Sequence, residues 1–199
     1  MDTPETISAF WFGTDADEAG TIATQSALWW RKRDEIDAAI RERFEHLVIQ
    51  AGNGQLDSWL QTPRGRLALI LLTDQFPRNI YRDSARAFAF DARALGWSKT
   101  AIALGSDRQC RPVERVFLYL PLEHSEHRDD QAESVRRFEA LAAAAGPAVK
   151  SSFDSFLDFA RRHREIVDRF GRFPHRNVAL GRQSTAAETA FLKQPGSRF

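Results

Sequence analysis

The sequence of 199 residues has few of the features that define several large classes of protein. It has a single cysteine, Cys110, which excludes an internal disulfide framework and is typical of a reducing compartment. No apolar run approaches the roughly 20 residues that a transmembrane helix needs. The acidic start has neither the basic region nor the apolar stretch of a signal peptide. We therefore expect a cytoplasmic globular protein that does not bind membranes.

Glycine and proline are also scarce, with 11 and 8 residues, so the chain is neither collagen-like nor of low complexity. The 15 Phe and 5 Trp, with a net charge of +1, exclude a disordered chain and argue against a nucleic-acid-binding module. Of the 28 basic residues, 24 are Arg, which suits bidentate contacts with carboxylates and phosphates. Codon bias produces the same usage, and we prefer that interpretation for most of them.

Apolar residues recur at spacings of three and four along most of the chain, which predicts helices, whereas the alternation typical of strands is missing. Residues 13–25, rich in Gly, Thr and Asp, predict a loop. The predicted helices begin at Thr3-Pro4 and then cover residues 34–52, 63–75, 84–104, 112–121, 130–145, 152–170 and 185–192. No linker divides the chain, so we expect one all-α domain over residues 1–199, with about eight or nine helices.

A short internal sequence repeat suggests how these helices are arranged. Phe76-Pro77-Arg78-Asn79 resembles the later segment Phe173-Pro174-His175-Arg176-Asn177, and these two segments hold two of the three Asn in the chain. Two similar helix–break–helix units predict stacked helical hairpins, a tetratricopeptide-like α-α superhelix. A regular 34-residue period is not visible, so the signal is weak.

Three polar residues stand where the helical pattern calls for apolar ones. His163 lies on the apolar face of the helix over 152–170, Asp74 on that of the helix over 63–75, and Gln131 on that of the helix over 130–145. A buried polar group without a hydrogen-bond partner costs roughly 1–3 kcal/mol, so we expect these three to meet one another. A single inward His is otherwise most often a satisfied core residue.

The segment from Leu122 to His127 crowds four ionisable groups into five positions. Such a cluster could bind a metal, form an acid–base pair or lie in water. The spacing matches no standard metal signature, so we expect no metal site. The residues that could have supplied ligands are Glu123, His124, Glu126, His163 and His175.

Arginines are concentrated at both Phe-Pro breaks. Arg78 and Arg82 follow the first, and Arg172, Arg176 and Arg182 surround the second. Several guanidinium groups beside a helix start can form an anion site. They can equally cap carbonyls and pair with carboxylates such as Asp74.

Four long segments, in this order, carry a family resemblance: residues 10–13 (FWFG), 69–79 (LILLTDQFPRN), 119–126 (YLPLEHSE) and 170–182 (FGRFPHRNVALGR). Together with Thr185 and Glu188 near the end, they resemble the bacterial domain-of-unknown-function family 924. The resemblance implies an all-helical, tetratricopeptide-like fold and no particular reaction, because no activity is assigned to the family. The family's motif positions are here Asp74, Gln75, Arg78, Asn79, Glu123, His124, Glu126, His163, Arg172, His175 and Asn177.

Three functions are compatible with these observations. The first is an internal polar pocket that binds a small anionic ligand or an acidic peptide terminus. The second is an acid–base, hydrolase-like enzyme in the same pocket, with His124 or His163 as the base and Asp74 orienting it. The third is a tetratricopeptide-like scaffold for protein interactions. The expected ligand-binding residues are Arg78, Asn79, Glu123, Glu126, Gln131, Arg172, His175, Arg176 and Asn177. No cofactor or oligomeric state is readable from the sequence.

Overall fold

The computed structural model describes residues 2–15 and 17–197, and every regular element within these ranges is helical. A π-helical turn, Leu71–Gln75, joins α4 to α5, so that the α-helices of the described residues form nine continuous helices. The predicted all-α fold is confirmed. The elements are α1 (Pro4–Phe12), α2 (Glu18–Trp30), α3 (Asp34–Gly52), α4 (Pro63–Ile70), α5 (Phe76–Ile80), α6 (Asp91–Ala103), α7 (Pro112–Glu123), α8 (Arg128–Ala144), α9 (Lys150–Phe170) and α10 (Ala186–Phe191).

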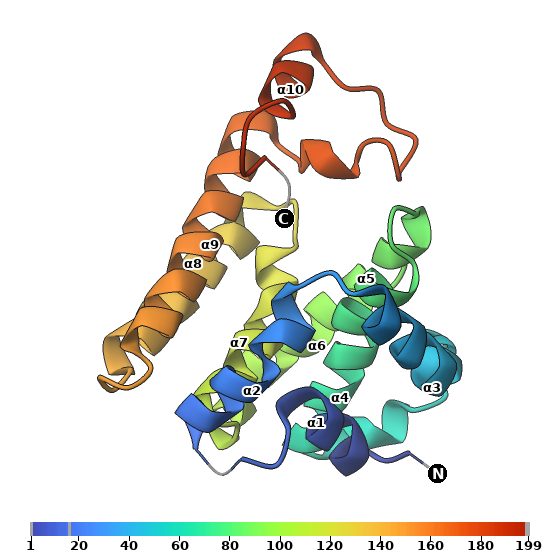
Figure 1. Cartoon of the computed structure of the whole chain (residues 1–199), viewed down its shortest axis with the longest axis vertical. Helices are drawn as coiled ribbons and strands as arrows, with labels where there is room; N and C mark the ends of the chain where they lie inside the picture. The colour runs from blue at the N-terminus through green and yellow to red at the C-terminus, as the bar shows by residue number, and fades with distance from the viewer. Residues whose placement is uncertain (1, 16, 198–199) are drawn as a thin grey trace.

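The helices form a body and an upright pair beside it (Figure 1). In the body, α1 packs against α4, α3 against α5, and α6 against α7. Helix α7 also packs against α8, and α8 and α9 lie against each other as an antiparallel hairpin that carries the C-terminal segment to the top of the molecule. One hairpin is thus present, and tetratricopeptide-like stacking of several hairpins stays a prediction.

Helix starts follow the capping residues in the sequence. The Thr3 hydroxyl accepts from the backbone N–H of Thr6, and Thr62 caps α4 in the same way. Thr185 and Glu188 form the predicted capping box at α10, with Thr185 N–H donating to Glu188 at 2.7 Å.

Two predicted boundaries are wrong. The helix from Pro63 was expected to end before Pro77, but the chain stays helical, because the N–H of Phe76 reaches back five residues to the carbonyl of Leu71. Pro77 then stands in the first turn of α5, where it needs no N–H donor. Residues 13–25 are not all loop, because Asp17 caps α2, and burial of Thr21 and Trp29 overrides the low helix propensity.

Two further predicted elements differ in extent. The helix expected over residues 84–104 divides into a 3-10 turn, Ala85–Phe88, and α6. Helix α7 continues past Pro121 as far as Glu123. Because of this extra turn, Glu123 and His124 lie at the end of a rigid, buried helix.

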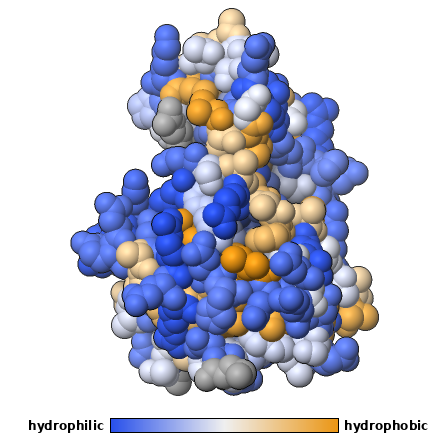
Figure 2. Space-filling model, turned by 90° about the vertical axis from the view of Figure 1, so that its right-hand side faces the viewer, coloured by the Kyte–Doolittle hydropathy of each residue, from blue (hydrophilic) through white to orange (hydrophobic). Residues whose placement is uncertain are grey.

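The buried apolar residues form two clusters. The larger one fills the body and includes Ala160 of α9, whereas the smaller one joins Ile166 and Val167 of α9 to Phe173. His163 lies on α9 between the two clusters, so the polar position of that helix face marks the boundary between them. The face seen in Figure 2 is mostly hydrophilic with a few apolar patches. Within the described residues, no helix is long and apolar enough to cross a membrane.

Candidate functional site

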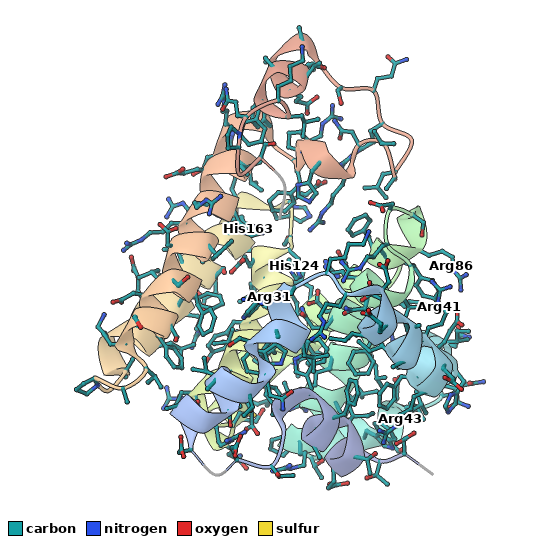
Figure 3. All side chains as sticks on the ribbon, in the orientation of Figure 1. Arg31, Arg41, Arg43, Arg86, His124 and His163 are labelled. Carbon is teal, nitrogen blue, oxygen red and sulfur yellow. The ribbon has the colours of Figure 1, made fainter. Side chains whose placement is uncertain are left out.

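A cavity of about 450 Å³ lies where the body meets the α8–α9 hairpin. In Figure 3, His163, His124 and Arg31 lie in this central region, whereas Arg41, Arg43 and Arg86 lie at the opposite edge of the body. The cavity is lined by Trp29, Trp30, Arg31, Lys32, Gln75, Arg78, Asn79, Arg82, Val116, Leu120, Glu123, His124, Phe138, Ser155, Phe156, Phe159 and His163.

A carboxylate–imidazole pair stands behind the wall of the cavity. Asp74, which the π turn directs inward, is fully buried, and its Oδ1 lies 2.8 Å from Nδ1 of His124. Burial alone would raise the pKa of Asp74, but the positive charge of Arg78 and the hydrogen bond from His124 hold it well below the usual range. An ionised Asp74 only accepts hydrogen bonds, so His124 carries its proton on Nδ1. The lone pair of His124 is then on Nε2.

The pKa of His124 is itself lowered. Burial disfavours the imidazolium first, the Arg78 charge adds to this, and Asp74 opposes both. His124 is therefore a neutral imidazole held in one tautomer, the state required of a general base.

A second carboxyl–imidazole pair lies beside the first. Glu123 Oε1 is 3.0 Å from Nδ1 of His163, and the same nitrogen is 2.8 Å from the carbonyl oxygen of Phe159. A carbonyl oxygen only accepts, so the proton of His163 lies on Nδ1 and points toward that oxygen. Burial holds the pKa of His163 well below its usual value.

Glu123 differs from Asp74 in its charge. Burial, together with the nearby negative charge of Asp74, raises the pKa of Glu123 to about 8, so this carboxyl is mostly neutral at pH 7. Its Oε2 atom is buried and has no hydrogen-bond partner among the described residues. The cavity therefore presents a neutral carboxyl group next to a neutral imidazole.

Gln131 holds the end of α7 in place. It is fully buried, and its side-chain N–H donates to the carbonyl oxygens of Glu123 and Ser125, each at 2.6 Å. These carbonyls would otherwise be unsatisfied at the helix end. Gln131 thus hydrogen-bonds to the backbone near the two imidazoles and, contrary to the prediction, does not line the cavity.

Each of the two Asn in the repeated motif donates a hydrogen bond to a carboxylate that an Arg also binds. Asn79 donates to Asp37 of α3 at 2.8 Å, and Arg82 forms a bidentate contact with the same carboxylate. Asn177 donates to Glu188 of α10 at 3.4 Å, and Arg172 binds that carboxylate through two nitrogens, at 2.6 and 2.9 Å. In each case an Asn and an Arg together fasten a Phe-Pro segment to a carboxylate on another helix.

The arginines that precede these two Asn converge on one acid. Arg78 binds Asp91 through two nitrogens at 3.0 Å, and Arg176 Nη1 lies 3.6 Å from Asp91 Oδ2. The Arg176 guanidinium is buried between the rings of Phe88 and Phe173, at 4.8 and 4.5 Å from their centroids. Burial and the positive charge of Arg78 lower the pKa of Arg176 to about 10.

Other predicted binding residues build the C-terminal segment and do not line the cavity. Glu126 accepts from Phe173 N–H at 2.8 Å and from Arg182 at 2.7 and 3.0 Å. The ring of His175 packs 5.6 Å from that of Phe173, and burial followed by the Arg176 charge lowers the pKa of His175 to about 3. Glu126, Arg172, His175, Arg176 and Asn177 thus form the framework above the cavity.

The structure brings five of the predicted residues to the cavity wall: Arg78, Asn79, Glu123, His124 and His163. Asp74 lies behind the cavity wall, where it contacts His124. Sequence reasoning missed Asp91, which no pattern singles out, and the run from Trp29 to Lys32. Two adjacent Trp followed by two basic residues are an unusual sequence and could have indicated this part of the wall.

Metal ligation and thiol chemistry have little basis in the geometry. Among residues 2–15 and 17–197, no group of three or more His, Cys, Asp and Glu is placed to hold a metal ion. Cys110 is buried, and burial with the nearby Glu114 carboxylate raises the pKa of its thiol to about 11.

Comparisons with known proteins agree with this description of the fold. A family model described as "Bacterial protein of unknown function (DUF924)" matches residues 7–196. Among solved structures, the chain is similar to a protein of unknown function, ATU0120 from Agrobacterium tumefaciens, at 34% sequence identity and a TM-score of 0.80, with 96% of each chain covered. No curated protein matches.

Proposed function

The chain belongs to the bacterial family of unknown function DUF924, and from that premise we propose that its central cavity binds a small organic anion. The observation that carries this proposal is the charge of the cavity lining. Among the described residues, four cationic side chains line it, and the one carboxyl group of this lining, Glu123, is mostly neutral at pH 7. The cationic lining residues are Arg31, Lys32, Arg78 and Arg82.

Two of these cations are already matched by carboxylates and two are not. Arg78 contacts Asp74 and Asp91, and Arg82 contacts Asp37. Arg31 and Lys32 are exposed directly after α2 and form no close ion pair with the described residues, although the charge of Lys32 contributes to the lowered pKa of Asp37. They leave positive charge at the cavity, which attracts an anion and favours its binding.

Thermal unfolding with a panel of carboxylates and phosphate esters tests the proposal. A ligand at about 100 times its Kd stabilises a protein by about 2.7 kcal/mol, which raises the Tm of a chain this size by roughly 5–10 °C. We expect at least one anion to do so, and the shift to diminish in Lys32→Glu and at high salt. Lys193→Glu, an exposed charge reversal outside the cavity, is the control. No shift with any anion, or equal loss in both variants, would overturn the proposal.

A second candidate function is acid–base catalysis by the Asp74–His124 pair in the same cavity. The observation that favours it is the 2.8 Å contact between Asp74 Oδ1 and His124 Nδ1, which orients the ring and leaves the Nε2 lone pair for a substrate proton. Nitrogen-15 NMR at pH 7 is expected to find the His124 proton on Nδ1. A proton on Nε2 would contradict this role.

Activity measurements would then separate catalysis from binding. In a screen of hydrolase substrates, we expect any turnover to be lost in His124→Gln. Glu133→Gln, at a half-buried position of α8 that does not line the cavity, is the control. Turnover that persists in a folded His124→Gln protein would remove the second candidate and leave the first.

A further inference from the structure

The cavity has two chemically different walls. Its basic groups lie on α5 and directly after α2 and α5, whereas its aromatic side chains lie on the last turn of α2 and on α8 and α9. Trp29 and Trp30 stand on α2, Phe138 on α8, and Phe156 and Phe159 on α9. A ligand that fits both walls must have a charged end and an apolar body.

Two aromatic side chains at this cavity are partly left in water. Trp30 is 48% exposed and Phe159 is 42% exposed, although both line the cavity. Trp30 lies 5.8 Å from Phe156 and packs one face against Phe117, at 5.7 Å and 13° between the ring planes. Large apolar surface exposed at a cavity indicates a binding site, because a ligand that covers it removes it from water.

The size of the cavity favours an occupant larger than the smallest anions. Its volume of about 450 Å³ lies within the roughly 300–1,000 Å³ of typical ligand pockets. Phosphate or acetate would fill a small part of it and would leave most of its aromatic side chains uncovered. Cavities of this size usually hold molecules with a substantial apolar surface and a few placed polar groups.

Resting on the binding function proposed above, we infer that the ligand is an aromatic carboxylic acid, with its carboxylate on the basic wall and its ring against Trp30, Phe156 and Phe159. Offset and edge-on contacts between aromatic rings stabilise such a body beyond its burial alone. On the carboxylate side, Arg31 and Lys32 supply positive charge, and Arg78, itself bound to Asp74 and Asp91, adds to it. The neutral Glu123 and His124 can hydrogen-bond to a further polar group of the acid.

Isothermal titration of the full-length protein with three probes tests this inference. The probes are 2-naphthoate, naphthalene-2-carboxamide, which keeps the ring and loses the charge, and acetate, which keeps the charge and loses the ring. We expect 2-naphthoate to bind at least about 30-fold more tightly than acetate and about 10-fold more tightly than the carboxamide. Equal affinity for 2-naphthoate and acetate would overturn the inference and leave the binding of anions intact.

Other outcomes bear on the binding function itself. If none of the three probes binds, the inference is wrong, and the anion panel described above decides the binding function separately. If the carboxamide binds as tightly as 2-naphthoate, the basic wall does not select an anion and the binding function fails with the inference.

Variants of the aromatic wall provide the second arm. Trp30→Ala and Phe159→Ala are each expected to weaken 2-naphthoate about 10-fold and to leave the weak binding of acetate unchanged. Leu104→Ala removes a side chain that is 69% exposed and lies outside the cavity, and it should change neither. If both wall variants fold and bind 2-naphthoate as the unchanged protein does, the aromatic wall has no part in recognition and the inference is wrong.

Discussion

Arg176 reaches from the C-terminal segment to within 3.6 Å of Asp91, at the start of α6. The oxygen it approaches is the one that Arg78 binds at 3.0 Å, so two guanidiniums share one carboxylate. The two arginines occupy equivalent positions in the repeated Phe-Pro motif, although 98 positions separate them in the sequence. Asp91 thus connects the framework above the cavity to the body below it.

Removing the charge of Asp91 should therefore destabilise the whole protein. In Asp91→Asn, Arg78 and Arg176 lose their common counter-charge, and we expect a loss of about 3 kcal/mol in the free energy of unfolding, measured in urea. Asp57→Asn is the matched control, because Asp57 also binds an arginine, Arg93, but at an exposed pair. The loss of unfolding free energy in Asp57→Asn should stay below about 1 kcal/mol. Equal losses in the two variants would contradict the shared role of Asp91.

The raised pKa of Glu123 predicts a loss of stability as the pH rises from 4.5 to about 8. Its pKa is about 8 in the folded protein, against 4.5 for an unperturbed Glu side chain, so between these values the folded state binds a proton that the unfolded state has released. The stabilisation is complete below pH 4.5 and disappears as the pH rises through 8. Its slope is at most about 1.4 kcal/mol per pH unit.

Glu123→Gln imitates the neutral carboxyl and should flatten this decline between pH 5 and 8 in urea titrations. Glu133→Gln should leave it unchanged, because hydrogen bonds from Arg136 and Arg137 outweigh burial and lower the pKa of Glu133. An identical decline in Glu123→Gln and the unchanged protein would show that Glu123 is ionised in the folded state.

The three histidines near the cavity predict a loss of stability in acid. Burial lowers the pKa of His124, His163 and His175 below 6.5, so below that pH the unfolded state binds protons that the folded state does not. Stability should fall as the pH drops from 6.5 toward 3. Each histidine contributes at most about 1.4 kcal/mol per pH unit to the decline in the free energy of unfolding, between its pKa in the folded state and its pKa in the unfolded state.

His175→Gln removes one of these groups and should reduce the steepness of the acid decline. His46→Gln, an exposed position on α3, serves as the control and should not change it. If the decline in His175→Gln is as steep as in the unchanged protein, protonation of His175 does not contribute to acid unfolding.

Two helical glycines should respond oppositely to alanine. A Cβ atom at Gly65 would lie 2.1 Å from the backbone oxygen of Trp59, which cannot move without disturbing the turn before α4, whereas nothing lies within 4 Å of a Cβ at Gly96. Gly65→Ala should destabilise the protein by at least about 2 kcal/mol. Gly96→Ala should stabilise it by about 0.4–1 kcal/mol through better helix propensity. Thermal unfolding measures both, and stabilisation in both would contradict the close packing of α4.

The sequence allowed most of the fold to be predicted, because apolar spacing and caps such as Thr62 and Thr185 are local signals. It also identified the inward positions of Asp74 and His163, since a polar residue within an apolar stripe is visible without a structure. Asp91 was not predictable, because its role depends on two arginines that only the tertiary fold brings together. The π turn was missed for a similar reason, since Pro77 locally favours the end of a helix.

The Leu71–Gln75 turn makes the number of residues in this helix as important as their identity. A π turn holds one residue more than an α turn, so deleting one position would let the stretch close with ordinary i→i+4 hydrogen bonds. Helix α5 would then keep roughly its present orientation, with Arg78 near Asp91 and Asn79 near Asp37, whereas the residues inside the turn would change direction. Shortening this stretch by a single codon would therefore act on Asp74, inside the turn, and leave the neighbouring arginine contacts in place.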